Sequence, residues 1–489
     1  MDASMNENSF QQTERLKVAV IGAGPAGVYA ADILLRQLKE QGNELGIGSE
    51  ARIDIFEKLP VPFGLVRYGV APDHPSIKYI IGALEKTLSN PDLHLYADVE
   101  FGKDITLDEL KDRYDVVLFA TGANDDRPLE IEGHDLAGVH GAAKFVEWYD
   151  GYPNAPENWP LEAQEVAVIG GGNVAMDVAR ILMRQADDLL PTDIPNNVYR
   201  GAQSNKARVL HMFIRRGPAQ AKFAVQELRE LEKLPGVQII VDNDDFDLDC
   251  ATLDRANDDK LTRQMLSELY TIVKMAQKMA DEGGTDFEGN PADRKYYLHF
   301  CQMPAAIVGE DGHVCGIRVE RTQVDEVGNM SPTGEYTVYP VQAVYHAIGY
   351  KPAQLEGIPY DLDQYTLVNE GGRIYTAPAG QGGQHIPRLY ATGWAKRGPV
   401  GLIGSTKSDA LETVSNMLVD LAAAPRHGKV ATDRDEDSID RLLSSKGIRP
   451  IDFAGWKRVD AYERSMGDKV GREHIKVTDP EELRRLALG

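Results

Sequence analysis

Two stretches of the chain share one pattern of apolar and polar positions. In each, a short apolar run is followed by a glycine-rich turn, by apolar residues at helical spacing, and by a second apolar run. This succession is typical of a β-α-β unit. The first unit is predicted as a strand over 17–21, a helix over about 26–40 and a strand over 52–56. The second is predicted as a strand over 165–169, a helix over about 174–186 and a strand over 208–214.

Three further strand-like runs indicate how these units are joined. The runs over 115–122 and 389–393 both end in Ala-Thr-Gly, and a similar run covers 343–349. Small residues at a strand end let the backbone approach a ligand or another strand. We therefore predict an α/β fold with two doubly wound, Rossmann-like dinucleotide-binding domains, the first of them discontinuous. The predicted limits are 1–123 and 348–489 for the first domain and 124–347 for the second.

The glycine turn of the first unit, Gly22-x-Gly24-x-x-Gly27, has the spacing of a dinucleotide-binding fingerprint. Gly22 permits a tight turn, Gly24 lets a diphosphate approach, and Gly27 allows the helix to pack on the strand. The next strand ends at Glu57, where a carboxylate can accept hydrogen bonds from ribose hydroxyls. The alternative for such a fingerprint is a tight turn that binds nothing.

The second unit carries a related turn, Gly170-x-Gly172-x-x-Ala175. The strand after it ends in Arg215-Arg216 instead of an acidic residue. Two guanidinium groups at this place are the expected way to hold a 2′-phosphate. The second unit is therefore predicted to bind NADP rather than NAD, and a solvated strand end is the alternative for the two arginines.

Composition narrows the class of protein. The 489 residues include 53 basic and 76 acidic residues, a net charge of -23 that would repel a polyanion, so we expect no nucleic-acid binding. The three cysteines, Cys250, Cys301 and Cys315, have no paired spacing. They fit a reducing compartment and provide neither a C-x-x-C dithiol nor enough thiolates for an iron–sulfur cluster. No metal site is predicted.

Nothing in the chain predicts a membrane segment or an export signal. Residues 1–16 are polar and acidic, unlike a signal or transit peptide, and no apolar run is long enough to span a bilayer. We expect a cytoplasmic protein with a short disordered leader. The acidic segment 242–258, the glycine-rich segment 283–293 and the charged segment 424–438 are predicted as surface loops.

Three longer motifs are more specific than the fingerprints. They are EKLPVPFGLVRYGVAPDHP over 57–75, RRGPxQ with ELRE over 215–230, and GWxKRGPxGxIG over 393–404. In these motifs and their order the chain resembles the adrenodoxin reductase family, which includes bacterial ferredoxin–NADP reductases. The resemblance implies a flavoprotein reductase that binds FAD and NADP(H). It also implies electron passage between NADPH and a small one-electron carrier such as ferredoxin, by hydride transfer from nicotinamide to flavin.

The fingerprints and the resemblance together assign residues to the two nucleotides. FAD is assigned Gly22, Gly24, Ala26, Gly27, Glu57, Leu65, Phe101, Trp394, Gly401, Leu402 and Ile403. NADP is assigned Gly171, Gly172, Asn173, Val174, Arg215, Arg216, Glu227 and, beside the nicotinamide, Gly401. Flavin reduction needs mainly the positioning of two rings. A helix that begins near 401–406 would direct its amino-terminal dipole at the flavin.

Two residues are candidates for a chemical role. The place of His74 and Glu230 in the family motifs implies a proton relay or a contact to the nicotinamide. The alternative for His74 is a structural loop histidine, because the proline after it holds it extended.

The net negative charge of the chain bears on how it would bind a ferredoxin, the partner that the resemblance implies. An acidic ferredoxin would need a local basic face on this acidic chain. The candidates are Arg36, Lys39, Lys206, Arg208, Arg229 and Lys233. Solvated helix faces are the alternative for each of them.

Other interpretations share the paired fingerprints. A flavin-containing NADPH-binding subunit of the glutamate-synthase small-subunit type and a thioredoxin reductase both need cysteines that this chain lacks. A non-enzymatic, nucleotide-bound sensor and a flavin monooxygenase stay open, because binding motifs do not prove turnover.

Overall fold

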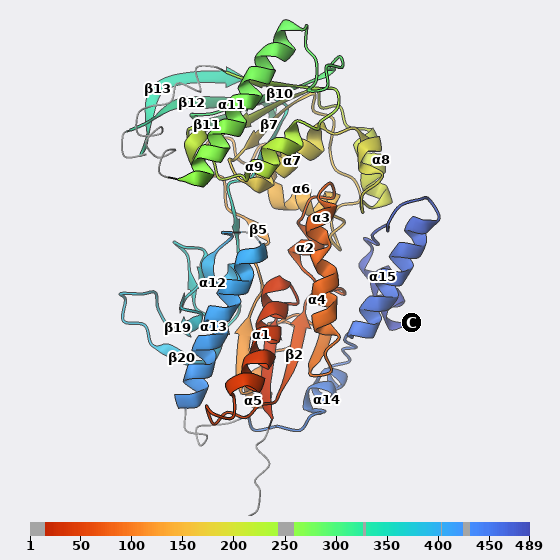
Figure 1. The fold of residues 1–489 in the computed structure, drawn as a ribbon, viewed down its shortest axis with the longest axis vertical. Helices are drawn as coiled ribbons and strands as arrows, with labels where there is room; N and C mark the ends of the chain where they lie inside the picture. Colours follow the sequence, from red (N-terminus) through yellow and green to blue (C-terminus); the bar gives the residue numbers. More distant parts are fainter. Residues whose placement is uncertain (1–14, 243–258, 326–328, 402, 424–430) are drawn as a thin grey trace, which may run out of the picture.

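The elements of the chain form two units, one above the other in Figure 1, and each unit is built on its own sheet. The structure is a computed structural model that describes residues 15–242, 259–325, 329–401, 403–423 and 431–489. No helix among these residues is both long and apolar enough to cross a membrane.

The sheet of the first unit has seven strands, and five consecutive ones are parallel. In spatial order they are β18 (Asn369–Glu370), β19 (Arg373–Tyr375), β20 (His385–Ala391), β4 (Val116–Phe119), β1 (Leu16–Ile21), β2 (Ala51–Glu57) and β3 (Leu93–Ala97). The strands β1, β2 and β4 are buried along their whole length, as expected of a sheet covered on both faces.

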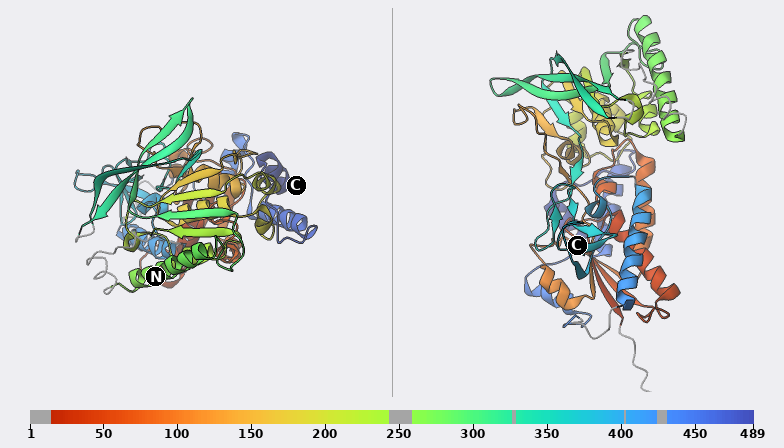
Figure 2. Two further views of the ribbon diagram at one scale, coloured as in Figure 1. Left: turned by 90° about the horizontal axis from the view of Figure 1, so that it is seen from above. Right: turned by 90° about the vertical axis from the view of Figure 1, so that its left-hand side faces the viewer.

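Helices cover both faces of this sheet. Figures 1 and 2 show α1 (Pro25–Gln41) beside α13 (Ile403–Ala423), the helix that begins in the GWxKRGPxGxIG motif. The others are α2 (Leu65–Tyr68), α3 (Pro75–Lys78), α4 (Ile80–Leu88), α5 (Leu107–Arg113), α12 (Trp394–Arg397), α14 (Ser438–Ser445), α15 (Phe453–Asp468) and α16 (Pro480–Leu488). The pairing of α1 with α13 brings together segments from the two ends of the chain.

The sheet of the second unit has six parallel strands. In spatial order they are β6 (Val139–Gly141), β14 (Ala343–His346), β7 (Glu165–Ile169), β8 (Val209–Phe213), β10 (Arg294–His299) and β9 (Val237–Val241). Its helices are α6 (Ala142–Tyr149), α7 (Asn173–Met183), α8 (Asn196–Gln203), α9 (Val225–Leu231) and α11 (Lys260–Asp281). The second unit is thus doubly wound like the first.

A third, antiparallel sheet projects from the second unit (Figure 2). It consists of β11 (Gln302–Glu310), β12 (His313–Val324) and β13 (Met330–Tyr339). The pattern of the sequence did not predict this sheet.

Two short strands pair where the chain passes between the units. β5 (Asp125–Asp126) is antiparallel to β15 (Tyr350–Lys351), and Tyr350 lies opposite Asp126. These crossings come just after the limits predicted at 123 and 347. We therefore keep the same division into domains as a proposal.

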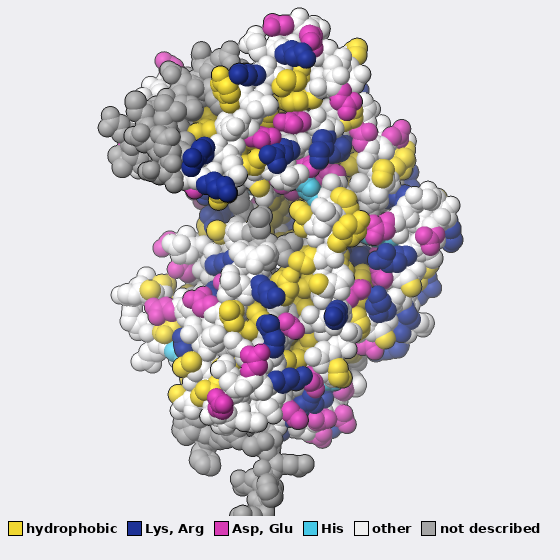
Figure 3. Space-filling view, viewed as in Figure 1, with side chains coloured by type: hydrophobic (Ala, Val, Ile, Leu, Met, Phe, Trp, Pro, Cys, Tyr) yellow, Lys and Arg dark blue, Asp and Glu magenta, His cyan; other side chains and the backbone are white. Residues whose placement is uncertain are grey.

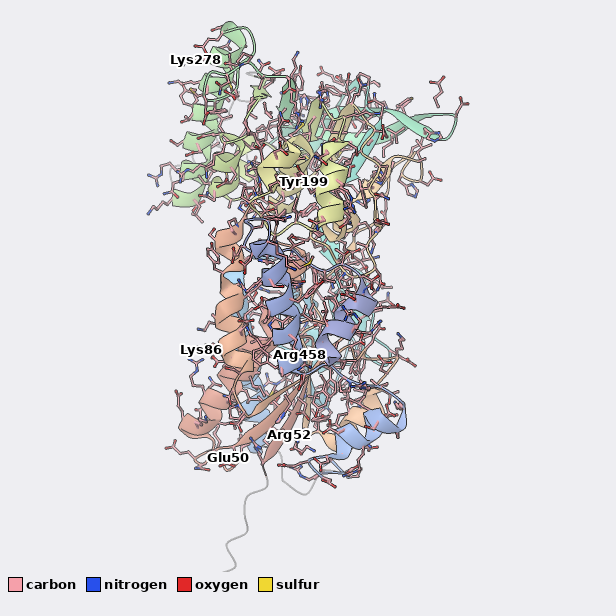
Figure 4. The ribbon with its side chains drawn as sticks, turned by 90° about the vertical axis from the view of Figure 1, so that its right-hand side faces the viewer. Glu50, Arg52, Lys86, Tyr199, Lys278 and Arg458 are labelled. Carbon is pink, nitrogen blue, oxygen red and sulfur yellow. The ribbon has the colours of Figure 1, made fainter. Side chains whose placement is uncertain are left out.

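The carboxyl ends of the central strands of the first sheet point toward the second unit. Figure 4 places Glu50 and Arg52, at the amino end of β2, far from Tyr199 and Lys278 of the second unit. In open parallel sheets, ligands bind at the carboxyl ends of the strands. The expected ligand position is therefore where the units meet.

A buried group of charges ties the carboxyl-terminal segment to both units. Lys476 donates hydrogen bonds to Asp150 Oδ1 at 3.1 Å and to the carbonyl of Arg67 at 2.8 Å, and its Nζ lies 2.9 Å from Asp193 Oδ2. Lys78 donates to the same two carboxylates at 2.8–2.9 Å. Since Arg67 and Lys78 belong to the first unit, this group, the Lys476 cluster, joins three separate parts of the chain.

The two predicted β-α-β units are confirmed, with small differences at the ends. The first strand begins at Leu16, so only residues before it can form the predicted leader. Residues 283–293 form a loop between α11 and β10, as predicted. The predicted leader up to residue 14, residues 243–258 and residues 424–430 lie outside the described residues. Residues 431–437 form a loop before α14, as predicted, whereas Ser438 begins that helix.

Candidate functional site

A cavity of about 370 Å³ lies at the carboxyl ends of the first sheet. Its walls combine residues from the first glycine turn, the end of β2, the loop after β4, the crossing strands and the start of α12. The predicted FAD residues that line it are Gly22, Gly24, Ala26, Glu57, Leu65, Phe101 and Trp394. Val174, at the start of α7 in the second unit, lines the same cavity. The two fingerprints therefore face one space.

The geometry of the first glycine turn fits a bound diphosphate. Gly22 has φ +113°, and a Cβ there would lie 2.4 Å from the carbonyl oxygen of Ala120, so only glycine allows this approach. A Cβ on Gly24 would meet nothing within 4 Å. Gly24 borders the cavity and precedes the first residue of α1, so backbone N–H groups at the helix start are available to an anion.

Glu57 is held rigidly at the end of β2. Its two carboxylate oxygens accept hydrogen bonds from the backbone N–H groups of Ala23 at 2.9 Å and Leu59 at 3.0 Å. Burial nevertheless raises the pKa of Glu57. Each carboxylate oxygen keeps a free lone pair, so the group can still accept hydrogen bonds from ribose hydroxyls.

The carboxyl-terminal part contributes the opposite wall. Trp394, the first residue of α12, and Thr406, in the first turn of α13, both line the cavity. Phe101 lines it as well and packs edge-on against Phe119, with ring centroids 5.2 Å apart. Of the remaining predictions, Gly27 lies behind the turn, with its would-be Cβ against the carbonyl of Gly22.

The structure describes only part of the predicted FAD-binding residues between α12 and α13. Gly401 is exposed, has φ +84° and does not line the cavity. Ile403 begins α13, but its side chain lies outside the described part of the structure, and Leu402 lies outside the described residues altogether.

The second glycine turn repeats the geometry of the first. Gly170 has φ +151°, and a Cβ there would lie 2.5 Å from the carbonyl oxygen of Ala347. A Cβ on Gly172 would again meet nothing within 4 Å. Asn173 does not point into open space, because its Oδ1 accepts a hydrogen bond from the N–H of Ala224 at 2.8 Å. This contact holds the loop before α9 against the turn.

Arg215 and Arg216 follow β8 at the same edge of the sheet. Arg215 is exposed and Arg216 half-buried, and their backbone carbonyls accept hydrogen bonds from Thr322 and Cys301. Within the described residues, neither guanidinium is joined to a carboxylate in an ion pair. Two positive groups on a fixed backbone thus stand ready for an anion.

The structure brings His74 to Glu227 and not to Glu230. His74 Nε2 lies 3.4 Å from Glu227 and 3.3 Å from Asp177. Burial lowers the pKa of His74, but hydrogen bonds with Asp177 and Glu227 outweigh burial and raise this pKa to about 9. Glu230 instead accepts hydrogen bonds from Gln226 and Lys233, each at 2.7 Å.

This group includes an arginine that sequence reasoning missed. Arg180 of α7 lies among the ligand atoms of His74, Asp177 and Glu227, which are all within 4.8 Å of one another. That spacing would also suit a metal ion, but the guanidinium fills the place of the cation. Four residues that the sequence analysis assigned to neither nucleotide also line the cavity: Tyr68, Thr121, Tyr350 and Thr406.

The candidate basic residues for a partner do not form one patch. Lys206, Arg229 and Lys233 are each in an ion pair with a nearby glutamate. On the face shown in Figure 3, positive and negative side chains are interspersed, and the surface is hollowed where the two units meet. This hollow, and not a single basic helix face, is the distinctive feature of that side.

Comparison with known proteins identifies the family. Residues 16–243 match the model of the pyridine nucleotide-disulphide oxidoreductases. The chain is 35% identical over 487 residues to human mitochondrial NADPH:adrenodoxin oxidoreductase, covering 97% of this chain and 92% of the relative. It is also 35% identical over 480 residues to the NADPH-ferredoxin reductase FprA of Mycobacterium tuberculosis, covering 96% and 99%.

The fold comparison agrees with the sequence comparison. The structure of Mycobacterium tuberculosis FprA in complex with NADPH superposes with a TM-score of 0.85 at 33% identity, over 97% of this chain and 100% of that one. Three findings indicate the same family: the sequence motifs, the paired Rossmann-like units and the relatives that match over nearly their full length. The chain belongs to the family of NADPH-dependent adrenodoxin and ferredoxin reductases.

Proposed function

We propose that this protein is an FAD-containing reductase that passes electrons between NADPH and a ferredoxin-like iron–sulfur carrier. One observation carries the proposal: the glycine turns of both units open toward the place where the units meet, and Val174 of the second turn lines the cavity of the first. Two nucleotides bound at these turns would have their reactive ends close together.

The residues around the cavity fit the FAD that the family implies. The open space beside Gly24 would admit the diphosphate, and the buried carboxylate of Glu57 would bind the ribose. Trp394 and Thr406 would border the ring system. Bound FAD would supply a centre that accepts two electrons from NADPH and gives them up one at a time.

The second unit fits NADPH. Arg215 and Arg216 would hold the 2′-phosphate, which distinguishes NADPH from NADH. Glu227 and His74 would lie beside the nicotinamide end, where their charges and hydrogen bonds orient the ring. Since flavin reduction requires alignment more than acid–base chemistry, we assign Glu227 and His74 to positioning and proton balance.

The first experiment is a titration of the purified protein under anaerobic conditions with NADPH and, in a parallel sample, with NADH. We expect a yellow protein that NADPH bleaches much faster than NADH. A protein that gains no flavin after FAD is added would contradict the proposal, and one that binds FAD but is not bleached would favour a nucleotide-bound sensor.

The carrier is tested with a purified [2Fe–2S] ferredoxin coupled to cytochrome c. We expect NADPH-dependent reduction whose rate falls as salt is added, because charge complementarity guides such docking. A rate independent of salt would exclude electrostatic docking. A cytoplasmic location stays a prediction, since the human relative is mitochondrial by name.

A further inference from the structure

Arg180 is the most heavily bonded side chain near the site, although no motif marked it. It lies on α7, five residues after the end of the second glycine fingerprint, and its side chain is fully buried. Its guanidinium donates to Asp73 from Nε at 2.6 Å and from Nη2 at 3.1 Å, and to Glu227 from Nη1 at 2.9 Å. Nη2 also lies 2.5 Å from Asp177 Oδ1.

These contacts cross from one unit to the other. Asp73 precedes α3 of the first unit, whereas Asp177 and Glu227 belong to α7 and α9 of the second. A planar guanidinium can hold carboxylates on two sides at fixed angles, which an ammonium cannot. Arg180 therefore sets the position of Glu227 relative to the loop that carries His74.

Arg180 also competes for a nitrogen of His74. Its Nη2 lies 2.6 Å from His74 Nε2. A guanidinium only donates hydrogen bonds, so Nε2 must offer its lone pair to make this contact. When Nε2 is protonated, it must instead donate to Asp177 or Glu227, at 3.3–3.4 Å. The imidazole thus has two mutually exclusive sets of partners, and Arg180 belongs to one of them.

The charges that surround His74 are nearly balanced. The carboxylates of Asp73, Asp177 and Glu227 face the guanidinium of Arg180, and Arg184 adds a second one through Asp73 at 2.9 Å. Glu230 adds a more distant negative charge. Removal of Arg180 would leave His74 among carboxylates that favour its charged form.

We infer that Arg180 is a positioning residue for the reaction: it fixes Glu227 for the nicotinamide and keeps His74 able to change its hydrogen-bond partner. This inference rests on the proposed function, because it assigns Glu227 and His74 to the nicotinamide end of bound NADPH. Arg180 itself is fully enclosed by the protein and acts only through these two residues.

The test compares Arg180→Gln and Arg180→Lys with a matched control, Arg184→Gln, in the FAD-bound protein. Arg184 contacts Asp73 but is not bonded to His74 or Glu227 in the described structure. Two quantities are measured: the NADP⁺ dissociation constant, and the titration midpoint of His74 by NMR of ¹³C-labelled histidine. The His74 signal is identified as the one missing in His74→Gln.

We expect Arg180→Gln to raise the His74 midpoint by about one pH unit or more, since it removes an adjacent positive charge. It should also weaken NADP⁺ binding about tenfold, since Glu227 loses a charge-assisted hydrogen bond. Arg180→Lys should restore the midpoint but not the affinity, because an ammonium lacks the planar fork of N–H groups that contacts Asp73 and Glu227 at the same time. Arg184→Gln should change the NADP⁺ affinity less than about twofold, because Arg184 contacts Asp73 and is not bonded to Glu227 in the described structure.

The outcomes separate this inference from the proposed function. If the unsubstituted protein does not bind NADP⁺, the proposed function itself fails. If it binds NADP⁺ and Arg180→Lys binds it equally well, the proposed function stands and the inference is overturned. Because Arg180→Lys keeps the buried charge, it decides the question even if Arg180→Gln does not fold.

Discussion

Replacing Lys476 with methionine should destabilise the whole molecule, because the Lys476 cluster joins three parts of the chain. The side chain of Lys476 is only 1% exposed, and its ammonium group contacts Asp150 and Asp193. Removing one partner of a buried ion pair costs about 3–5 kcal/mol. Lys78 remains beside both carboxylates, so we expect a loss of about 3 kcal/mol. For 489 residues that unfold as one unit this corresponds to a fall in melting temperature of about 3 °C, because the entropy of unfolding is about 2.1 cal/mol/K per residue.

Thermal unfolding of the FAD-bound protein measures this effect. Lys469→Met is the matched control, because Lys469 is exposed at the end of α15. The double variant Lys476→Met/Asp193→Asn, which removes one charge of each sign, should recover part of the loss. If Lys476→Met lowers the melting temperature no more than Lys469→Met does, the cluster does not stabilise the fold and the reasoning is refuted.

Three further predictions concern nucleotides and pH. Arg215→Ala and Arg216→Ala should each weaken NADPH binding by about tenfold or more and leave NADH binding unchanged, as equilibrium titration with each nucleotide would show. Gly24→Val should abolish FAD binding while the chain stays folded, because the backbone there is extended and the added side chain enters the cavity; flavin absorbance and circular dichroism check this, with the equally uncrowded Gly82→Ala as control. Burial lowers the pKa of His211 to about 4 and that of His299 to about 3. As pH falls below about 6.5, these histidines therefore bind protons in the unfolded chain but not in the folded one. Each should lower the free energy of unfolding by about 2 kcal/mol at pH 5. Urea unfolding at pH 7 and pH 5 measures the loss, and His299→Gln should reduce it; an unchanged loss would contradict the assignment.

The sequence was most informative where function depends on adjacent residues. Each glycine turn, its strand and its helix lie within one short stretch, so spacing alone predicted both Rossmann-like units. The open space beside Gly24 and Gly172 follows directly from that spacing. The three-stranded sheet and α11 were missed, because they are additions to the second unit that carry no comparable local motif.

The pairing of charges could not be predicted from the sequence. Arg180 looks like an ordinary helix residue, and its partner Asp73 lies 107 residues away in the chain. The same applies to His74, whose place in a motif suggested Glu230 although the fold brings Glu227 and Asp177 nearer. Long-range ion pairs depend on how the two units pack, and a single sequence records that packing only indirectly.

The paired strands β5 and β15 make the two passages of the chain between the units a single joint. Two linkers bonded side by side favour rotation about one line as the relative motion of the units, against the restraint of the Lys476 cluster and the Arg180–Asp73 contact. Asp125 and Tyr350 belong to this joint and also line the cavity. Any such rotation changes the cavity wall, so nucleotide binding on the second unit would alter the surroundings of the flavin in the first. The colour of the flavin would then report domain movement directly.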